Sequence, residues 1–430
     1  MNDAFRQPDW VLLRRMDQTL RSFAAALSAS LLLLSCGSPE PVLSSAPPAV
    51  PARFDAAQVT QGARLAAVGN CVTCHTAPGG KPYAGGYPLH TPFGTVHGTN
   101  ITPDPETGIG RWTMADFDRA MREGVDPRGH HYYPAFPYDY FTRLGDGDIA
   151  ALYAFVMTRE AVRAPEPDNH MLVPRVAVGI WKSKYFHPGR FVPDASRDAR
   201  WNRGAYLAES LAHCSACHTP RNKLGGEERE HYMAGGEADG WHAPALNRDS
   251  PSPTPWDARK LAIYLSTGLV DDHAITAGPM APVVRNLAHA NHEDVQALAL
   301  YVADLMKGAT GASPSTSGSP PRGEQLTRGA VIYAGSCGDC HDRGRTAEGG
   351  ALQLPLAIAL SLPTPANLIH IVRDGIVPLE HEAQPWMPAY KGALTAEQTA
   401  DLVVYLRTLS GKPAWANVSA EVRKIEGESR

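Results

Sequence analysis

Three short motifs built from cysteine and histidine are the parts of this chain best suited to carry chemistry. Each reads Cys-x-x-Cys-His, and together they use six of the seven cysteines. They occupy residues 71–75, 214–218 and 337–341. One helical turn presents both sulfurs and the imidazole to one edge and one face of a flat macrocycle. This spacing therefore predicts covalent attachment of a c-type haem.

Each member of the motif has a predicted role. The two thiols form thioethers with the vinyl groups of the haem, and the adjacent histidine becomes the proximal ligand of the iron. The predicted attachment residues are Cys71, Cys74, Cys214, Cys217, Cys337 and Cys340. The predicted proximal ligands are His75, His218 and His341. The sequence thus predicts three covalently attached haem c groups.

Other chemistries also use isolated Cys-x-x-Cys pairs. Such a pair is half of many zinc sites, and it is the reactive unit of redox-active dithiols. In this chain every pair is followed at once by histidine, the motifs stand a small domain's length apart, and the N-terminus reads as an export signal. These three features together favour haem attachment over both alternatives.

Methionines in proline-rich loops are predicted to supply the sixth iron ligand at the second and third sites. A soft or imidazole donor is needed on the face opposite the proximal histidine. Met280 lies in the sequence Gly-Pro-Met-Ala-Pro, and Met387 lies between Trp386 and Pro388. Most methionines fill gaps in hydrophobic cores, but these two precede a closing helix and stand among prolines. We therefore predict that both are axial ligands.

The first site departs from this pattern. Its matching loop, residues 133–138, places Phe136 where methionine is expected, and phenylalanine cannot ligate iron. Two candidate donors remain: Met157 at the end of the closing helix, and His131 just before the loop. A vacant position is the third alternative. We favour Met157; ligation by His131 would give this haem a lower potential than the others, because methionine ligation raises the potential.

The segments around the motifs repeat with them, which indicates one module used three times. Upstream of each motif lies a helical segment with a Gly-Ala pair, beginning at Gly62, Gly204 and Gly329. Downstream, an amphipathic helix closes each module. We expect each glycine to let the closing helix cross closely, with an aromatic residue packed at the contact. The aromatic residues in that role are Phe155, Tyr301 and Tyr405.

These repeats predict a mainly α fold of three tandem class I cytochrome c-like domains joined by linkers. The predicted organisation is a lipoprotein-type export signal (1–35), a flexible tether (36–53), a first domain (54–165), a linker (166–200), a second domain (201–307), a linker (308–322), a third domain (323–411) and a polar tail (412–430). The second linker is rich in Gly, Ser, Pro and Thr, so we expect the third domain to have some freedom relative to the others.

The N-terminal residues predict export and anchoring. Arginines precede an apolar run, Phe23–Leu34, which is shorter than the roughly 20 residues that cross a bilayer. The run ends Leu-Leu-Ser-Cys and resembles a bacterial lipobox, which predicts lipidation of Cys36. Ordinary cleavage nearby is the alternative. We expect the protein on the periplasmic side of a bacterial membrane, held there by its N-terminal lipid.

Composition sets outer limits on function. The chain of 430 residues is 43% apolar and 20% charged, with a net charge of −4. This balance gives no electrostatic reason to expect a nucleic acid partner. The 39 glycines and 37 prolines indicate loop-rich domains with short helices and little sheet. We identify no catalytic acid, base or nucleophile.

Three longer stretches carry a resemblance to a known family. Residues Phe93–Trp112, Ala205–Asn222 and Met280–Pro282 make the chain, over about residues 54–411, similar to the three-haem cytochrome c subunits of bacterial periplasmic dehydrogenases. That family serves alcohol, aldehyde, gluconate and related dehydrogenases. Phe136 and the His-Thr-Pro-Arg-Asn sequence after the second motif most resemble the cytochromes paired with molybdenum hydroxylases. Members often hold the membrane through a C-terminal amphipathic segment, which the lipobox would replace here.

The resemblance implies an electron-transfer function. A partner dehydrogenase of molybdenum, quinoprotein or flavin type, oxidising an aldehyde, alcohol or N-heterocycle, would pass electrons through the three haems to quinone or a terminal acceptor. Two other hypotheses stay open. The chain could be an enzyme of the haem peroxidase type that uses an open first site, or a free-standing lipoprotein cytochrome that feeds a terminal oxidase.

Overall fold

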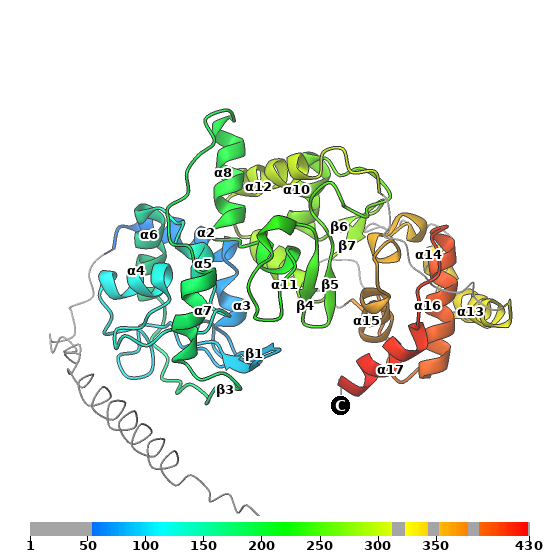
Figure 1. The fold of residues 1–430 in the computed structure, drawn as a ribbon, viewed down its shortest axis with the longest axis horizontal. Helices are drawn as coiled ribbons and strands as arrows, with labels where there is room; N and C mark the ends of the chain where they lie inside the picture. The colour runs from blue at the N-terminus through cyan, green and yellow to red at the C-terminus, as the bar shows by residue number, and fades with distance from the viewer. Residues whose placement is uncertain (1–53, 312–322, 343–351, 377–386, 429–430) are drawn as a thin grey trace, which may run out of the picture. The chain divides into compact units, whose positions relative to one another are not determined.

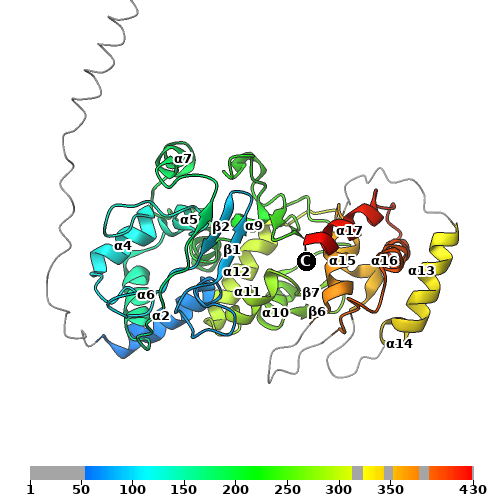
Figure 2. The ribbon, with the colours of Figure 1, turned by 90° about the horizontal axis from the view of Figure 1, so that it is seen from below.

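A computed structural model describes residues 54–311, 323–342, 352–376 and 387–428 (Figures 1 and 2). The predicted export signal, the tether with Cys36, and Trp386 lie outside these residues. Helices make up most of the regular structure, which confirms the predicted mainly α class. Within the described ranges, no helix combines the length and the apolar character needed to cross a membrane.

The helices and strands are short and follow one another closely. The α-helices are α2 (Ala56–Val68), α3 (Cys71–Cys74), α4 (Met114–Glu123), α5 (Tyr138–Phe141), α6 (Asp146–Met157), α7 (Ala177–Tyr185), α8 (Ala199–Glu209), α9 (Ser215–His218), α10 (Ala258–Thr267), α11 (Met280–Leu287), α12 (His292–Leu305), α13 (Gly323–Ser336), α14 (Gly338–His341), α15 (Ala366–Asp374), α16 (Ala396–Leu409) and α17 (Val418–Glu428). Three 3-10 turns are η1 (Arg229–His231), η2 (Leu354–Leu356) and η3 (Ile358–Leu360).

Strands occur in small antiparallel sheets. They are β1 (Pro88–Thr91), β2 (Gly94–His97), β3 (His170–Met171), β4 (Gly236–Ala238), β5 (Trp241–Ala243), β6 (Leu269–Val270) and β7 (Ala274–Ile275). The first sheet has the order β1-β2-β3, with Leu89 opposite Val96. The pairs β4-β5 and β6-β7 form the other two sheets. These short strands therefore lie in the segments that connect the helices.

Each of the three modules is built on a crossed pair of helices: α2 with α6, α8 with α12, and α13 with α16. The crossings are as close as predicted. A Cβ on Gly62 would lie 2.0 Å from the Ala151 carbonyl oxygen, and one on Gly204 would lie 2.0 Å from that of Ala297. At Gly329 the corresponding distance, to the Asp401 carbonyl oxygen, is 2.3 Å. Only glycine permits backbones to approach this closely.

The predicted aromatic residues lie at these crossings. The Cβ atoms of Phe155, Tyr301 and Tyr405 stand within 2.7, 2.9 and 2.7 Å of the places that a glycine Cβ would occupy. Each ring also meets another aromatic residue; for example, the Tyr301 and Trp201 centroids are 5.1 Å apart. The predicted packing of the closing helices is therefore confirmed.

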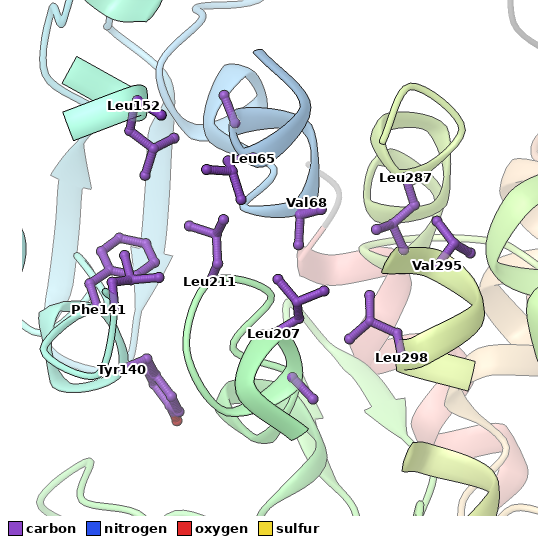
Figure 3. Packing of buried hydrophobic residues seen from close by; sticks show 14 of the residues in the cluster. Leu65, Val68, Tyr140, Phe141, Leu152, Leu207, Leu211, Leu287, Val295 and Leu298 are labelled. Carbon is purple, nitrogen blue, oxygen red and sulfur yellow. The ribbon is translucent and has the colours of Figure 1, made fainter. Parts of the chain in front are cut away.

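The first and second domains share one hydrophobic core. Figure 3 shows Leu65, Val68 and Leu152 of the first domain with Leu207 and Leu211 of the second. Leu211 reaches the end of α2, where a Cβ on Gly69 would lie 2.9 Å from the leucine Cδ1. Because the apolar side chains form one continuous cluster, these two domains are packed together rather than tethered loosely.

The segment 166–200, predicted as a linker, contains regular structure. Its strand β3 adds to the first domain's sheet, and its helix α7 packs against that domain. Lys182 of α7 is buried and donates hydrogen bonds to the carbonyl oxygens of Glu123 and Gly124 at the C-terminus of α4. A cation at that end of a helix is favourable because the helix dipole is negative there.

The third domain has its own core, and the chain's end belongs to it. Trp415, Val418, Val422 and Ile425 are buried against α15 and α16. The prediction of a polar tail over 412–430 is therefore wrong. The spacing of the last three residues gives α17 one apolar face, and burying this face offsets the cost of ordering the segment.

The third domain also contacts the second, although the composition of the linker predicted some freedom between them. The backbone N–H groups of Gln353 and Ile358 donate to the carbonyl oxygens of Asp271 and His273, each at 2.9 Å. The predicted domain boundaries otherwise stay predictions.

Candidate haem-binding sites

The three motifs adopt the same local structure. Each lies in a single turn (α3, α9 or α14) directly after the first helix of its module. In each, the histidine N–H donates to the carbonyl oxygen of the first cysteine, at 3.1 Å for His75, 3.1 Å for His218 and 3.0 Å for His341. This i to i+4 bond places the imidazole one turn above the first sulfur, on the same side. The predicted helical turn of the motif is confirmed.

The imidazoles of the first two sites are oriented by backbone carbonyls. His75 Nδ1 lies 2.6 Å from the Thr99 carbonyl oxygen, and His218 Nδ1 lies 2.7 Å from that of Pro244. Since a carbonyl only accepts, Nδ1 carries the proton and Nε2 keeps its lone pair. Burial lowers the pKa of both imidazoles, so they are neutral at pH 7. A neutral, oriented imidazole is the form that ligates a metal.

The third histidine is held differently. His341 Nδ1 is buried, and within the described ranges it meets no group with hydrogen-bond geometry. Burial lowers the pKa of His341, and the Leu352 backbone opposes that effect. The ring therefore shares the neutral state of the other two, without their strong orienting bond.

Burial keeps four of the motif thiols protonated. Burial raises the pKa of Cys71 and Cys214 to about 12, and that of Cys74 and Cys337 to about 11. A redox-active dithiol needs at least one thiol of depressed pKa. These cysteines have the opposite electrostatics, which disfavours the dithiol alternative.

The local backbone structure holds Met280 and Met387 in place. Met280 is half-buried and begins α11, two residues after Gly278, which has φ +53°. Met387 is half-buried and exchanges two backbone hydrogen bonds with Ile376, at 2.9 and 3.0 Å. Each methionine is therefore placed by its backbone rather than by packing of its side chain alone.

Phe136 of the first domain is part of an aromatic cluster. Its ring centroid lies 5.5 Å from that of Tyr132 and 5.6 Å from that of Phe141, both edge-to-face, and 6.4 Å from that of Tyr138. Such pairs add to the stability gained from burial. In this loop the residue at the methionine position thus serves packing.

The two candidate donors for the first site differ in availability. His131 Nδ1 lies 3.0 Å from Lys182 Nζ, and burial together with that cation lowers the pKa of the imidazole. Because the ammonium donates to Nδ1, the ring proton is on Nε2, and neither nitrogen offers a free lone pair. Met157, the last residue of α6, packs at the edge of the shared core. The arrangement counts against His131, and ligation by Met157 stays a prediction.

A polar side chain of the second module reaches the first motif. Asn286 of α11, the helix that begins with Met280, donates to Asn70 Oδ1 at 2.5 Å and to Thr73 Oγ1 at 3.2 Å, in and beside the first motif. Within the second module, Glu227 accepts from Ser215 Oγ of the second motif at 2.9 Å. The first motif is thus in direct contact with the second module.

Glu227 also reaches the aromatic loop of the first domain, where it accepts a hydrogen bond from the Tyr140 hydroxyl. The neighbouring Asp139 has a buried Oδ1 that meets no hydrogen-bond donor among the described residues. Burial raises the pKa of Asp139 to about 6, opposed by Arg221 and supported by Glu227. Sequence reasoning missed these residues, because nothing in their local sequence signals a contact across 87 positions.

Taken together, the residues present fit haem c. Each motif offers two thiols and a neutral imidazole, and at two sites the imidazole has its Nε2 lone pair free. Close backbone approach tightens the first two motifs: a Cβ on Gly98 would lie 1.7 Å from the Cys74 carbonyl oxygen, and one on Gly236 would lie 2.4 Å from that of Cys217. The donor set is the one that c-type attachment requires.

Two parts of the chain match known protein families. Residues 59–160 match the family described as cytochrome c. Residues 324–406 match the family described as cytochrome c oxidase, cbb3-type, subunit III. These ranges hold the first and third motifs.

Whole-length similarity is found to dehydrogenase subunits. The chain is 36% identical to the gluconate 2-dehydrogenase cytochrome c subunit of Pantoea cypripedii, over 85% of this chain and 88% of that one. It is 34% identical to the cytochrome c subunit of alcohol dehydrogenase (quinone) of Gluconacetobacter polyoxogenes, over 86% and 84%. Identity is 40% to a nicotinate dehydrogenase subunit of Pseudomonas putida, over 94% of this chain but only 35% of that protein. The chain thus spans about a third of the length of that relative.

Proposed function

This chain belongs to the cytochrome c electron-transfer subunits of dehydrogenases, and on that premise we propose that it holds three haem c groups and carries electrons from a periplasmic dehydrogenase to quinone or another respiratory acceptor. Cytochrome c domains bind haem c covalently, and the bound haem supplies reversible one-electron chemistry. The number of haems, the residues that hold them, the partner and the acceptor are parts of the proposal.

One observation supports the count of three. The second module, residues 201–307, repeats the construction of the first: a glycine-crossed helix pair, a one-turn motif, and a histidine whose Nδ1 donates to a carbonyl. The third repeats the helix pair and the turn. A shared construction at three places supports a shared cofactor at all three.

The residues have the following proposed roles. The six motif cysteines form the thioether bonds, and His75, His218 and His341 are proximal ligands. Met280 and Met387 are the sixth ligands at the second and third sites. At the first site the sixth position belongs to Met157 or is vacant, because Lys182 engages His131. The chain's residues thus attach and orient the haems, and set their potentials through ligation and burial.

The partner is proposed to be an enzyme that oxidises an aldehyde, alcohol or N-heterocycle. The similarity to a nicotinate dehydrogenase subunit, and to subunits of gluconate and alcohol dehydrogenases, supports this range of substrates. Its catalytic cofactor would be of the molybdenum, quinoprotein or flavin type. We also propose a periplasmic location with a lipid on Cys36, which lies outside the described residues.

Native purification tests this function. Affinity capture of the full chain from membranes of its source should recover a catalytic dehydrogenase subunit. Addition of that enzyme's substrate should then reduce the haems, seen as sharpening of the visible absorption bands. If the captured chain has no dehydrogenase with it, or if substrate leaves the haems oxidised, the electron-transfer role with this partner is wrong.

The same preparation distinguishes the peroxidase alternative. Three low-spin haems that do not bind cyanide in the oxidised state support electron transfer. A high-spin first haem that binds cyanide and turns over peroxide would support an enzyme that uses an open site beside Phe136.

A further inference from the structure

Trp241 and His370 form a flat ring stack between the second and third domains. Their ring centroids are 4.8 Å apart, and the planes differ by only 17°. Trp241 belongs to β5 and His370 to α15, two elements that lie in contact. Stacked aromatic pairs of this kind contribute to association beyond the area that they bury.

On the side of the second domain, Trp241 packs on the loop before the predicted ligand Met280 and lies close in sequence to the residue that orients His218. Its indole packs on the loop before Met280, where a Cβ on Gly278 would lie 2.3 Å from the ring. Three residues further along the chain, the Pro244 carbonyl accepts the hydrogen bond from His218. The position of this tryptophan is therefore tied to the second site.

On the side of the third domain, α15 leads directly to the predicted ligand Met387. The helix ends at Asp374, and the residue after its glycine cap, Ile376, exchanges both backbone hydrogen bonds with Met387. The stack therefore connects the ligand loop of one site with the ligand strand of the next.

A second contact fixes the register of this junction. The Asn367 side chain accepts from the His242 backbone N–H at 2.7 Å and donates to the His242 carbonyl oxygen at 2.9 Å. Asn367 lies one turn before His370 on α15. Two neighbouring side chains of one helix thus hold two neighbouring residues of β5.

The ring nitrogens of His370 make little use of their capacity for hydrogen bonds. Nε2 is buried and meets no hydrogen-bond partner among the described residues, and Nδ1 lies 3.3 Å from Asp374 Oδ2. A buried polar atom without a partner costs free energy. The stack with the indole offsets part of this cost.

We propose that Trp241 and His370 are positioning residues that dock the third domain so that electrons pass between the second and third haems. One electron leaves the reduced site and reduces the other, so the total charge is unchanged and no proton or further reactant is consumed. The inference rests on the proposed haems at both sites. It adds a specific contact that determines how fast they exchange electrons.

Pulse radiolysis of the oxidised holoprotein tests the proposal, by following how an injected electron redistributes among the haems. The main variant is His370→Leu, because Trp241, and not His370, is the ring that packs against Gly278 of the Met280 loop. The stack is worth up to about a tenfold change in a docking equilibrium. We expect the rate of redistribution between the second and third haems to fall by about three- to tenfold, with haem content and midpoint potentials unchanged.

Three further variants keep the test decisive. His370→Phe retains a flat ring and should restore the rate to within about twofold. Trp241→Leu removes the opposite ring and should slow the same step, even if the His370→Leu protein cannot be prepared. The control His289→Leu removes an exposed histidine from the second domain and should have no effect. Unchanged rates in both stack variants would overturn the proposal. A missing haem, measured separately by haem content, would instead contradict the proposed function.

Discussion

The first and second domains share a scaffold but carry different residues at the predicted sixth position. Both cross their helices at a glycine, and both hold the motif histidine through a backbone carbonyl. The loops predicted to face these motifs differ: Phe136 joins an aromatic cluster, whereas Met280 begins a helix. The comparison teaches that the motif and the loop with the predicted sixth ligand are separate parts of the module. One can change while the other is kept.

The largest expected effect tests whether the scaffolds are equivalent. Gly62→Val and Gly204→Val each place side-chain atoms where a carbonyl oxygen already lies 2.0 Å from the Cβ position. We expect each substitution to lower the free energy of unfolding by about 3 kcal/mol, because the helices are forced apart. Denaturant titration of the holoprotein measures this loss.

Gly147→Ala is the matched control for these substitutions. Gly147 lies in α6, and its Cβ would meet nothing within 4 Å. Alanine should therefore stabilise the helix slightly, by about 0.5–1 kcal/mol. A large loss at only one of the two crossings would show that the scaffolds are not equivalent.

The second prediction concerns the contrasting loops. Met280→Leu keeps the volume of the side chain but removes the sulfur, so the potential of the second haem should fall by on the order of 100 mV. Phe136→Leu should leave all three potentials unchanged, because phenylalanine donates nothing to the iron. A spectroelectrochemical titration measures both. If Met280→Leu shifts no potential, Met280 is not a ligand.

The third prediction concerns a carboxyl group found in only one of the two loops. Asp139 lies three residues after Phe136, and Val283 lies three residues after Met280. Burial raises the pKa of Asp139 from 3.8 to about 6. Between these two pKa values the folded state therefore binds more protons than the unfolded state. The free energy of unfolding falls as the pH rises through this range.

Asp139→Asn should remove this fall in stability. The free energy of unfolding of the variant, relative to wild type, should rise by about 2 kcal/mol between pH of about 4 and about 7. This is less than the full pKa shift implies, because the side chain is partly exposed. Arg143, Arg221 and Glu227 face the carboxyl group and remain in place. Val283→Ala should cost the same at both pH values. An equal pH dependence in wild type and Asp139→Asn would refute the assignment.

The smallest expected effect concerns the hydrogen bonds between the second module and the first motif. Asn286→Ala removes the hydrogen bonds to Asn70 and Thr73, and should cost about 1 kcal/mol while leaving haem content unchanged. Thr142 lies six residues after Phe136, as Asn286 does after Met280, and its hydroxyl accepts only a 3.3 Å bond from the Gly189 N–H. Thr142→Ala should cost less, about 0.5 kcal/mol. Thermal unfolding of both variants tests this order.

Much of the fold could be predicted from the sequence because its causes are local and repeated. The one-turn motif is set by the spacing of its own residues, and the helix crossings are marked by Gly62, Gly204 and Gly329. The helix α17 was missed although Val418, Val422 and Ile425 have helical spacing, because a polar composition concealed a narrow apolar face. Periodicity was the better guide there.

The parts of the sites that depend on distant contacts could not be predicted. Thr99 and Pro244 orient the imidazoles through carbonyl oxygens, which every residue has. Glu227 meets Tyr140, and Trp241 meets His370, only because the folded modules bring them together. Composition and spacing carry no record of such pairs.

The central claim is that three haems are attached, and the second site tests it most directly, because the matched families cover residues 59–160 and 324–406. The measurement is the mass of the denatured mature protein produced with the haem attachment machinery, together with the mass of the peptide that holds Cys214 and Cys217. The account predicts three haems on the protein and one on that peptide, with two haems left in a Cys214→Ala, Cys217→Ala variant. Two haems on the wild-type protein, with free thiols at Cys214 and Cys217, would contradict it.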